Sequence, residues 1–119
     1  MSYRRVCVAL LPLFLSACAT TDPEPVEQLR LTEQALSQAK ALGVTAEQSA
    51  TLRLAEQKFA LAQAYAEEGE FRDARNQAEQ AELDARLAEA EHLTEKSKQQ
   101  LVELRKGITQ LRKQLGGLQ

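Results

Sequence analysis

One uninterrupted stretch constrains the fold of this chain more than any other feature: from Phe71 to Lys106 it contains neither glycine nor proline. These two residues most often end helices, so their absence favours one long helix. A stop is expected only at Gly116-Gly117, which gives a helix of about 45 residues and on the order of 68 Å. Gly107 costs roughly 1 kcal/mol relative to alanine, and we expect a bend or fraying there.

Two shorter helices are predicted upstream. Good helix formers fill residues 26–42, and Gly43 supplies the left-handed residue that commonly closes a helix. Thr45 and Gln48 have the spacing of a capping box, which predicts a second helix over residues 46–68. Alanine, glutamate, lysine, leucine and arginine supply 59 of the 102 residues from Cys18 onward, above the roughly 50% that marks long helices and coiled coils.

The second and third helices carry facing stripes of small and apolar residues at alternating intervals of three and four, the spacing of a coiled coil. The stripes are Leu52, Ala55, Phe59, Ala62 and Ala66, and Ala74, Ala78, Ala81, Ala85 and Ala88. Alanine lets helices approach closely, and the short connection over residues 68–70 predicts an antiparallel hairpin. The first helix would cover it with one of two faces, Leu29, Leu36 and Ala39 or Leu31, Ala35 and Leu42. We therefore expect an all-α fold: a helical hairpin covered by a short N-terminal helix, with the third helix extending as a coiled-coil-like tail.

The first 17 residues have the pattern of a secretory signal peptide, with two arginines, an apolar run and small residues at the end. The apolar run of about 12 residues is shorter than the roughly 20 that cross a bilayer and contains Pro12, which disfavours a retained membrane span. The quartet Leu15, Ser16, Ala17 and Cys18 resembles the bacterial lipobox. That resemblance implies cleavage before Cys18 and acylation of Cys18 with fatty chains such as palmitate. Ordinary secretion with a free thiol at Cys18 is the weaker alternative.

Three acyl chains would hold the mature protein stably at a membrane. Lipoproteins with Asp directly after the acylated cysteine tend to stay in the inner membrane. This chain has Ala19 at that position, and in this it resembles lipoproteins that are sorted to the outer membrane. By that resemblance we expect an outer-membrane lipoprotein that faces the periplasm. Residues 18–25 would form the lipidated cysteine and a tether, 26–95 a three-helix unit, and 96–119 a helical extension.

The extension combines a leucine-rich seam with positive charge. Residues 96–119 hold six bases and one acid, whereas residues 67–95 hold ten acids and three bases. The shorter helices cannot cover the whole third helix, so its distal part would be bare or would meet a partner. The candidate partner-binding residues are Leu101, Leu104, Ile108, Leu111 and Leu115, with Lys98, Arg105 and Arg112 as a basic stripe beside them. That stripe is either a solvated surface or a site for an acidic helix, an anionic envelope polymer or a phosphate-bearing lipid.

Catalysis finds little support in the composition. Aromatic residues make up 4% of the chain, there is no tryptophan, and His92 is the single histidine. No nucleophile–base pair or cofactor loop is evident, and we expect no catalytic residue, cofactor, metal or small-molecule substrate. His92 with neighbouring glutamates could form a metal pair, but a surface histidine on an acidic helix is the interpretation we adopt. Negative overall charge and the expected compartment argue against nucleic acid.

The order lipobox, proline-bearing tether, helix and long hairpin resembles a family of small proteobacterial lipoproteins. The segments that carry the resemblance are residues 55–60, 69–75 and 78–89, and it extends over roughly Val26 to Leu111. The helical domain of that family is domain of unknown function four-three-nine-eight. The resemblance implies an all-helical, outer-membrane envelope protein without catalytic residues, sometimes joined to a peptidoglycan-binding domain that this sequence lacks.

These observations favour a non-enzymatic lipoprotein that acts as a protein–protein interaction or envelope-integrity scaffold through helical coiled-coil contacts. Two alternatives stay open. The chain could self-associate as a structural lipoprotein without a separate partner, as in a parallel homodimer, or its basic tail could bind an anionic envelope polymer or lipid. The identity of the partner, the biological process and the oligomeric state are not encoded in any motif that we find.

Overall fold

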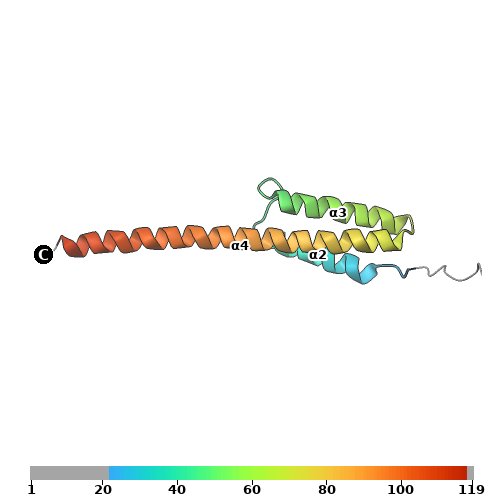
Figure 1. Cartoon of the computed structure of the whole chain (residues 1–119), viewed down its shortest axis with the longest axis horizontal. Helices are drawn as coiled ribbons and strands as arrows, with labels where there is room; N and C mark the ends of the chain where they lie inside the picture. Colours follow the sequence, from blue (N-terminus) through green and yellow to red (C-terminus); the bar gives the residue numbers. More distant parts are fainter. Residues whose placement is uncertain (1–21, 118–119) are drawn as a thin grey trace, which may run out of the picture.

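The computed structural model describes residues 22–117, which form three helices: α2 (Val26–Ala41), α3 (Ala50–Glu67) and α4 (Phe71–Gly116). The expected all-α fold with a long third helix is confirmed (Figure 1). No helix within the described residues has the length and apolar character needed to span a membrane. The signal peptide, the lipobox with Cys18, the first part of the tether and residues 118–119 lie outside the described residues.

The three helices run up, down and up, so that α2 is parallel to α4 and α3 is antiparallel to both (Figure 1). Near the start of α2, Arg75 Nη2 donates to the Pro23 carbonyl oxygen (3.0 Å). On the other side of α4, Lys58 Nζ of α3 donates to the Asp84 carboxylate (2.6 Å). This order places residue 22 at one end of the molecule and residue 117 at the other.

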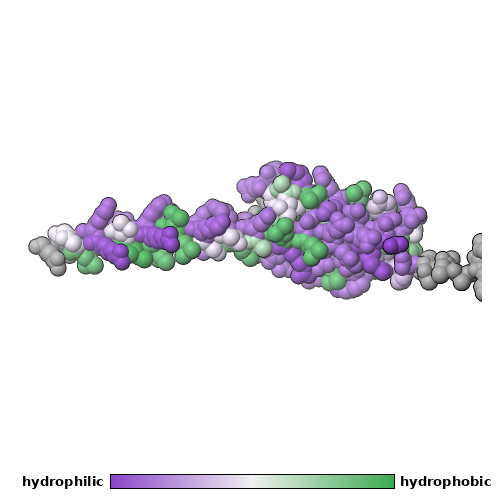
Figure 2. All heavy atoms as spheres, in the orientation of Figure 1, coloured by the Kyte–Doolittle hydropathy of each residue, from purple (hydrophilic) through white to green (hydrophobic). Residues whose placement is uncertain are grey.

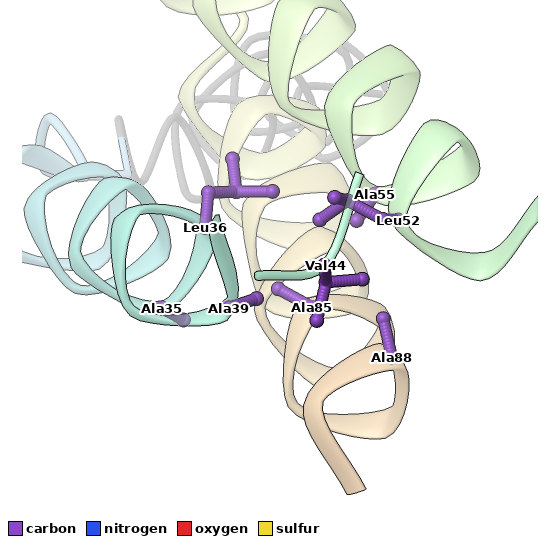
Figure 3. Close-up of a cluster of buried hydrophobic side chains, with 8 residues drawn as sticks. All are labelled: Ala35, Leu36, Ala39, Val44, Leu52, Ala55, Ala85 and Ala88. Carbon is purple, nitrogen blue, oxygen red and sulfur yellow. The ribbon is translucent and has the colours of Figure 1, made fainter. Parts of the chain in front are cut away.

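Alanine forms most of the core. All five residues of the predicted α4 stripe are buried, with Ala74, Ala78, Ala81 and Ala85 at 0% exposure and Ala88 at 1%. The α3 stripe is buried at Leu52, Ala55 and Ala62, and its Phe59 packs against the core while partly exposed. The main cluster joins α2, α3 and α4 close to the α2–α3 connection (Figure 3). The predicted close antiparallel hairpin is therefore confirmed.

The buried face of α2 combines parts of the two candidate faces. It consists of Thr32, Ala35, Leu36 and Ala39, while Leu42, expected on the second face, is 40% exposed. Thr32 is fully buried, and its Oγ1 lies 2.9 Å from the carbonyl oxygens of Gln28 and Ala78. A buried hydroxyl needs such a partner, and this one ties α2 to the backbone of α4.

Both turns use glycine as predicted. Gly43 has φ 97° and Gly69 has φ 80°, the left-handed region that glycine adopts without steric cost. The N–H of Val44 donates to the Ala39 carbonyl, and that of Glu70 to the Tyr65 carbonyl. These bonds close each helix end in a Schellman motif.

The predicted start of α3 is wrong by four residues. Thr45 does not cap the helix; residues 45–48 form a turn, in which the Thr45 carbonyl accepts from the N–H groups of Gln48 and Ser49. Ser49 is the N-cap, and its Oγ accepts from the N–H of Leu52 at 3.0 Å. The turn is needed because Val44 is buried at the end of the α2 Schellman motif, and the chain must cross to α3 before Leu52 can enter the core.

The bend or fraying expected at Gly107 is not observed. α4 is helical from Phe71 to Gly116 without interruption, and Figure 1 shows no kink in its distal part. Glycine weakens a helix through backbone entropy but keeps the N–H that proline lacks, so the hydrogen-bond ladder continues through it. The predicted stop at Gly116-Gly117 is confirmed.

Candidate interaction surface

The most distinctive surface is a row of exposed, mostly apolar side chains along α4. The row, here named the α4 seam, comprises Leu83, Leu87, Ala90, Thr94, Ser97, Leu101, Leu104, Ile108, Leu111 and Leu115. Its large side chains are between 43% and 67% exposed. Figure 2 shows hydrophobic residues exposed along the extended part of α4, among polar ones.

The seam points away from the bundle. Leu83 stands two residues from Ala81 and from Ala85, a separation that places side chains on opposite sides of a helix. Both alanines are fully buried, whereas Leu83 is 67% exposed. α4 therefore has two apolar sides: an alanine side that packs on α2 and α3, and the seam, which no residue in the described part of the chain covers.

Beyond His92 every described residue of α4 is exposed, so α4 leaves the bundle as a single helix. The structure places all five candidate apolar residues, from Leu101 to Leu115, on this extension. The Ser97 hydroxyl of the seam is satisfied locally, by donating to the Leu93 carbonyl oxygen at 2.8 Å. The extension therefore presents apolar surface to solvent on a fully formed helix.

The basic stripe lies beside the seam. Lys98, Arg105 and Arg112 are all exposed and follow one another at intervals of seven residues. The single acid of the extension, Glu103, is paired with Lys106 (2.8 Å), so it does not neutralise the stripe.

Continuing the same interval toward the bundle reveals two acidic residues that the sequence analysis missed. They are Glu91 and Asp84, seven and fourteen residues before Lys98. Asp84 accepts from Lys58, and Glu91 accepts from the Thr51 hydroxyl (2.9 Å). The signal was present in the sequence, because the interval alone would have found both.

His92 is the one residue for which the sequence leaves a metal-binding role open. His92 is half-buried, and its Nε2 lies 3.9 Å from the point where a Cβ on Gly43 would stand. It therefore lies beside the α2–α3 turn and keeps part of its surface exposed, which is compatible with the surface histidine expected from the sequence. Within residues 22–117 no group of three or more His, Cys, Asp or Glu side chains is placed to hold a metal ion.

Comparison with known families adds the decisive observation, since a family model described as "Domain of unknown function (DUF4398)" matches residues 27–104. This chain belongs to the DUF4398 family. The resemblance proposed from the sequence is thereby confirmed for the helical domain, and the match lies within the expected span. Among proteins of curated function, none matched the chain.

A solved structure shows the same fold. The chain is similar to a DUF4398 family protein from Pseudomonas aeruginosa PAO1 studied by crystallography, with 57% sequence identity and a TM-score of 0.78. The match covers 82% of this chain and 100% of that one. The DUF4398 assignment thus rests on both sequence and architecture. The family description names no reaction for the domain.

Proposed function

We propose that this DUF4398 protein is a non-enzymatic lipoprotein of the outer membrane that faces the periplasm and docks a helical partner on the α4 seam. The observation that carries this proposal is the exposure of large apolar residues at coiled-coil spacing over about 48 Å, from Leu83 to Leu115. A monomer rarely exposes so many large apolar side chains along one helix side without a binding role.

The mechanism is tethered recognition. Acylation of Cys18 would hold the chain at the membrane and raise its local concentration there. The seam then supplies apolar contact, in the manner of an amphipathic helix that pairs with another. Such a chain would serve as an adaptor or as an envelope-integrity scaffold.

A second candidate function is binding of an anionic envelope polymer or lipid. The basic stripe of Lys98, Arg105 and Arg112 favours it, because six bases and one acid share residues 96–119. Electrostatic binding of this kind weakens with salt, whereas apolar docking on the seam does not.

The proposal is tested by placing a photo-crosslinking amino acid at Leu111 of the full chain and illuminating cells. Gln110, exposed and one position off the seam, carries the same probe as the control. Protein adducts from Leu111 in excess of those from Gln110 are expected. Equal labelling at both positions would refute docking on the seam, and adducts to glycan or lipid alone would favour the second candidate.

A paired substitution tests the same surface by loss of contact. Leu104→Asp together with Leu111→Asp should abolish the protein adducts, since two charges within the seam would have to be desolvated on docking. The photo-crosslinking residue then stands at Leu115 of the seam, in this variant and in its unsubstituted control. Persistence of every adduct in the variant would rule out the seam as the docking surface.

A further inference from the structure

The flank of the α4 seam reverses its charge at mid-helix. Five residues at intervals of seven lie on this flank: Asp84 and Glu91, then Lys98, Arg105 and Arg112. In heptad terms they occupy the e positions next to the seam. An acidic first half and a basic second half make this flank complementary to its own reversed copy.

We propose that the seam binds a second copy of this chain in antiparallel orientation. This inference rests on the proposed docking role of the seam, and it identifies the partner that docks there as a second copy of the chain. Antiparallel pairing aligns the seam with itself so that Leu87 meets Leu104, Ala90 meets Leu101, and Leu83 meets Ile108 of the other copy. In the central layer Thr94 meets Ser97, so the two polar members of the seam face each other rather than leucine.

The same alignment pairs the charges. In an antiparallel coiled coil e positions face e positions, so Glu91 meets Lys98 and Asp84 meets Arg105 of the second copy. The twofold symmetry repeats both pairs, giving four attractive contacts and no repulsive one. Asp84 already accepts from Lys58 at 2.6 Å, so Arg105 would join a carboxylate that is held in place.

A parallel pair fits the charges less well. Its e positions face g positions of the partner, which here are Glu79, Arg86, Leu93, Gln100 and Gly107, so that Asp84 would meet another acid, Glu79. Only Arg86 could pair, with Glu91, while Lys98, Arg105 and Arg112 would meet no acid. The charge pattern therefore favours the antiparallel dimer over the parallel homodimer considered from the sequence.

The bundle leaves this surface open. Leu83 and Leu87 lie on the part of α4 that packs against α2 and α3, yet they are 67% and 50% exposed. A second α4 can therefore lie along residues 83–108, about 38 Å of helix, without displacing either neighbour. The bare extension of each copy would then rest on the bundle half of the other.

The test uses paired cysteines in the full chain, expressed in cells and treated with a short bis-maleimide crosslinker. Leu87→Cys/Leu104→Cys is expected to yield a covalent dimer at twice the monomer mass, because each cysteine meets the other kind in the second copy. The two positions are about 26 Å apart along one helix, too far for a crosslink within one chain. Neither single variant should crosslink, and the unsubstituted chain controls for Cys7 and Cys18.

Three results would overturn the antiparallel dimer. Crosslinking of each single variant would show parallel pairing, and crosslinking of Leu87→Cys/Leu111→Cys in preference would show another register. Monomer in every variant would exclude a second copy. The docking function would survive the last result if Leu111 photo-adducts contained a different protein, and would fall if Leu111 labelled nothing above Gln110.

Charge exchange provides a second measurement. In the Leu87→Cys/Leu104→Cys background, Lys98→Glu should reduce the yield of dimer, since it sets two glutamates against each other at both central pairs. Adding Glu91→Lys should restore the yield by recreating opposite charges. An unchanged yield in the Lys98→Glu variant would contradict the proposed charge pairing.

Discussion

At the residue scale, alanine sets the distance between the helices of this bundle. Five alanines of α4 are at most 1% exposed, and their small side chains allow the helices that pack on them to approach closely. The heptad pattern is sufficient to predict these positions, because it depends only on the spacing of small and apolar residues. The same pattern misses Thr32, since threonine counts as polar in it. The carbonyl oxygens of Gln28 and of Ala78 on α4 explain how its hydroxyl can be buried.

Ala81→Leu should destabilise the bundle by about 1–3 kcal/mol or more, because three additional heavy atoms must fit into a fully packed interface. Gln80→Leu, one position earlier and exposed, is the matched control and should change stability by less than about 0.5 kcal/mol. Denaturant unfolding of both variants provides the measurement. Equal effects would show that the alanine stripe does not set the packing distance.

Glu82 should make stability depend on pH. Hydrogen bonds from Gln28 (2.8 Å) and from Arg86, with the positive charge of Arg86, lower the pKa of the Glu82 carboxyl below its ordinary value. A lowered pKa in the folded state stabilises the fold above the unfolded value of about 4.3, and the stabilisation is lost as pH falls through the folded pKa.

Unfolding of the wild-type chain and of Glu82→Gln measures this effect. The wild type should be the more stable of the two at neutral pH, and the difference should shrink on acidification. Glu79→Gln, at an exposed position one turn away, controls for loss of a negative charge. A difference that stayed constant from neutral pH to pH about 3 would contradict the assigned hydrogen bonds.

At the element scale, the helix ends differ in how far local sequence determines them. Gly43 and Gly69 are predictable because a left-handed residue closes a helix regardless of its surroundings. The start of α3 is not, since Thr45 and Gln48 match a capping box and Ser49 lacks the acidic or amide partner at the third following position. The choice between them depends on the burial of Val44 and Leu52, which is a property of the assembled bundle.

The two candidate caps can be separated by mutation. Ser49→Ala should cost about 1 kcal/mol, because the N–H of Leu52 would lose its acceptor. Thr45→Ala should cost less, since only the backbone carbonyl of Thr45 bonds within the turn. Chemical denaturation ranks the two variants, and a larger loss for Thr45→Ala would place the cap at the position expected from sequence.

At the scale of the whole molecule, the protein is a small bundle with a helical extension. The heptad seam and the absence of glycine between Phe71 and Lys106 make this outline predictable, because helix length and spacing are local properties. The acidic half of the seam flank is easily overlooked, since Asp84 and Glu91 also contact α3 and could be assigned to the hairpin.

Removing residues 101–119 from the lipid-free chain should leave the melting temperature of the bundle nearly unchanged in dilute solution, because the described residues of this segment are exposed. In the intact chain that temperature should rise with protein concentration, as mass action requires for a dimer. The truncated chain should show no such rise, which calorimetry over a range of concentrations can determine. A large loss of stability on truncation at low concentration would mean that the extension supports the bundle directly.

The parallel course of α2 and α4 decides how the protein would stand on a membrane. Arg75 holds the chain near Pro23, so a lipid on Cys18 would attach at the end opposite the basic extension, and a single copy would stand upright with that extension far from the lipid. In the proposed pair the two attachment ends lie about 60 Å apart, more than the roughly 24 Å that residues 19–25 span when extended. Two anchors in one membrane would then hold the dimer with its long axis along the bilayer surface. Pairing would thus change the orientation of α4 from perpendicular to the membrane to parallel to it.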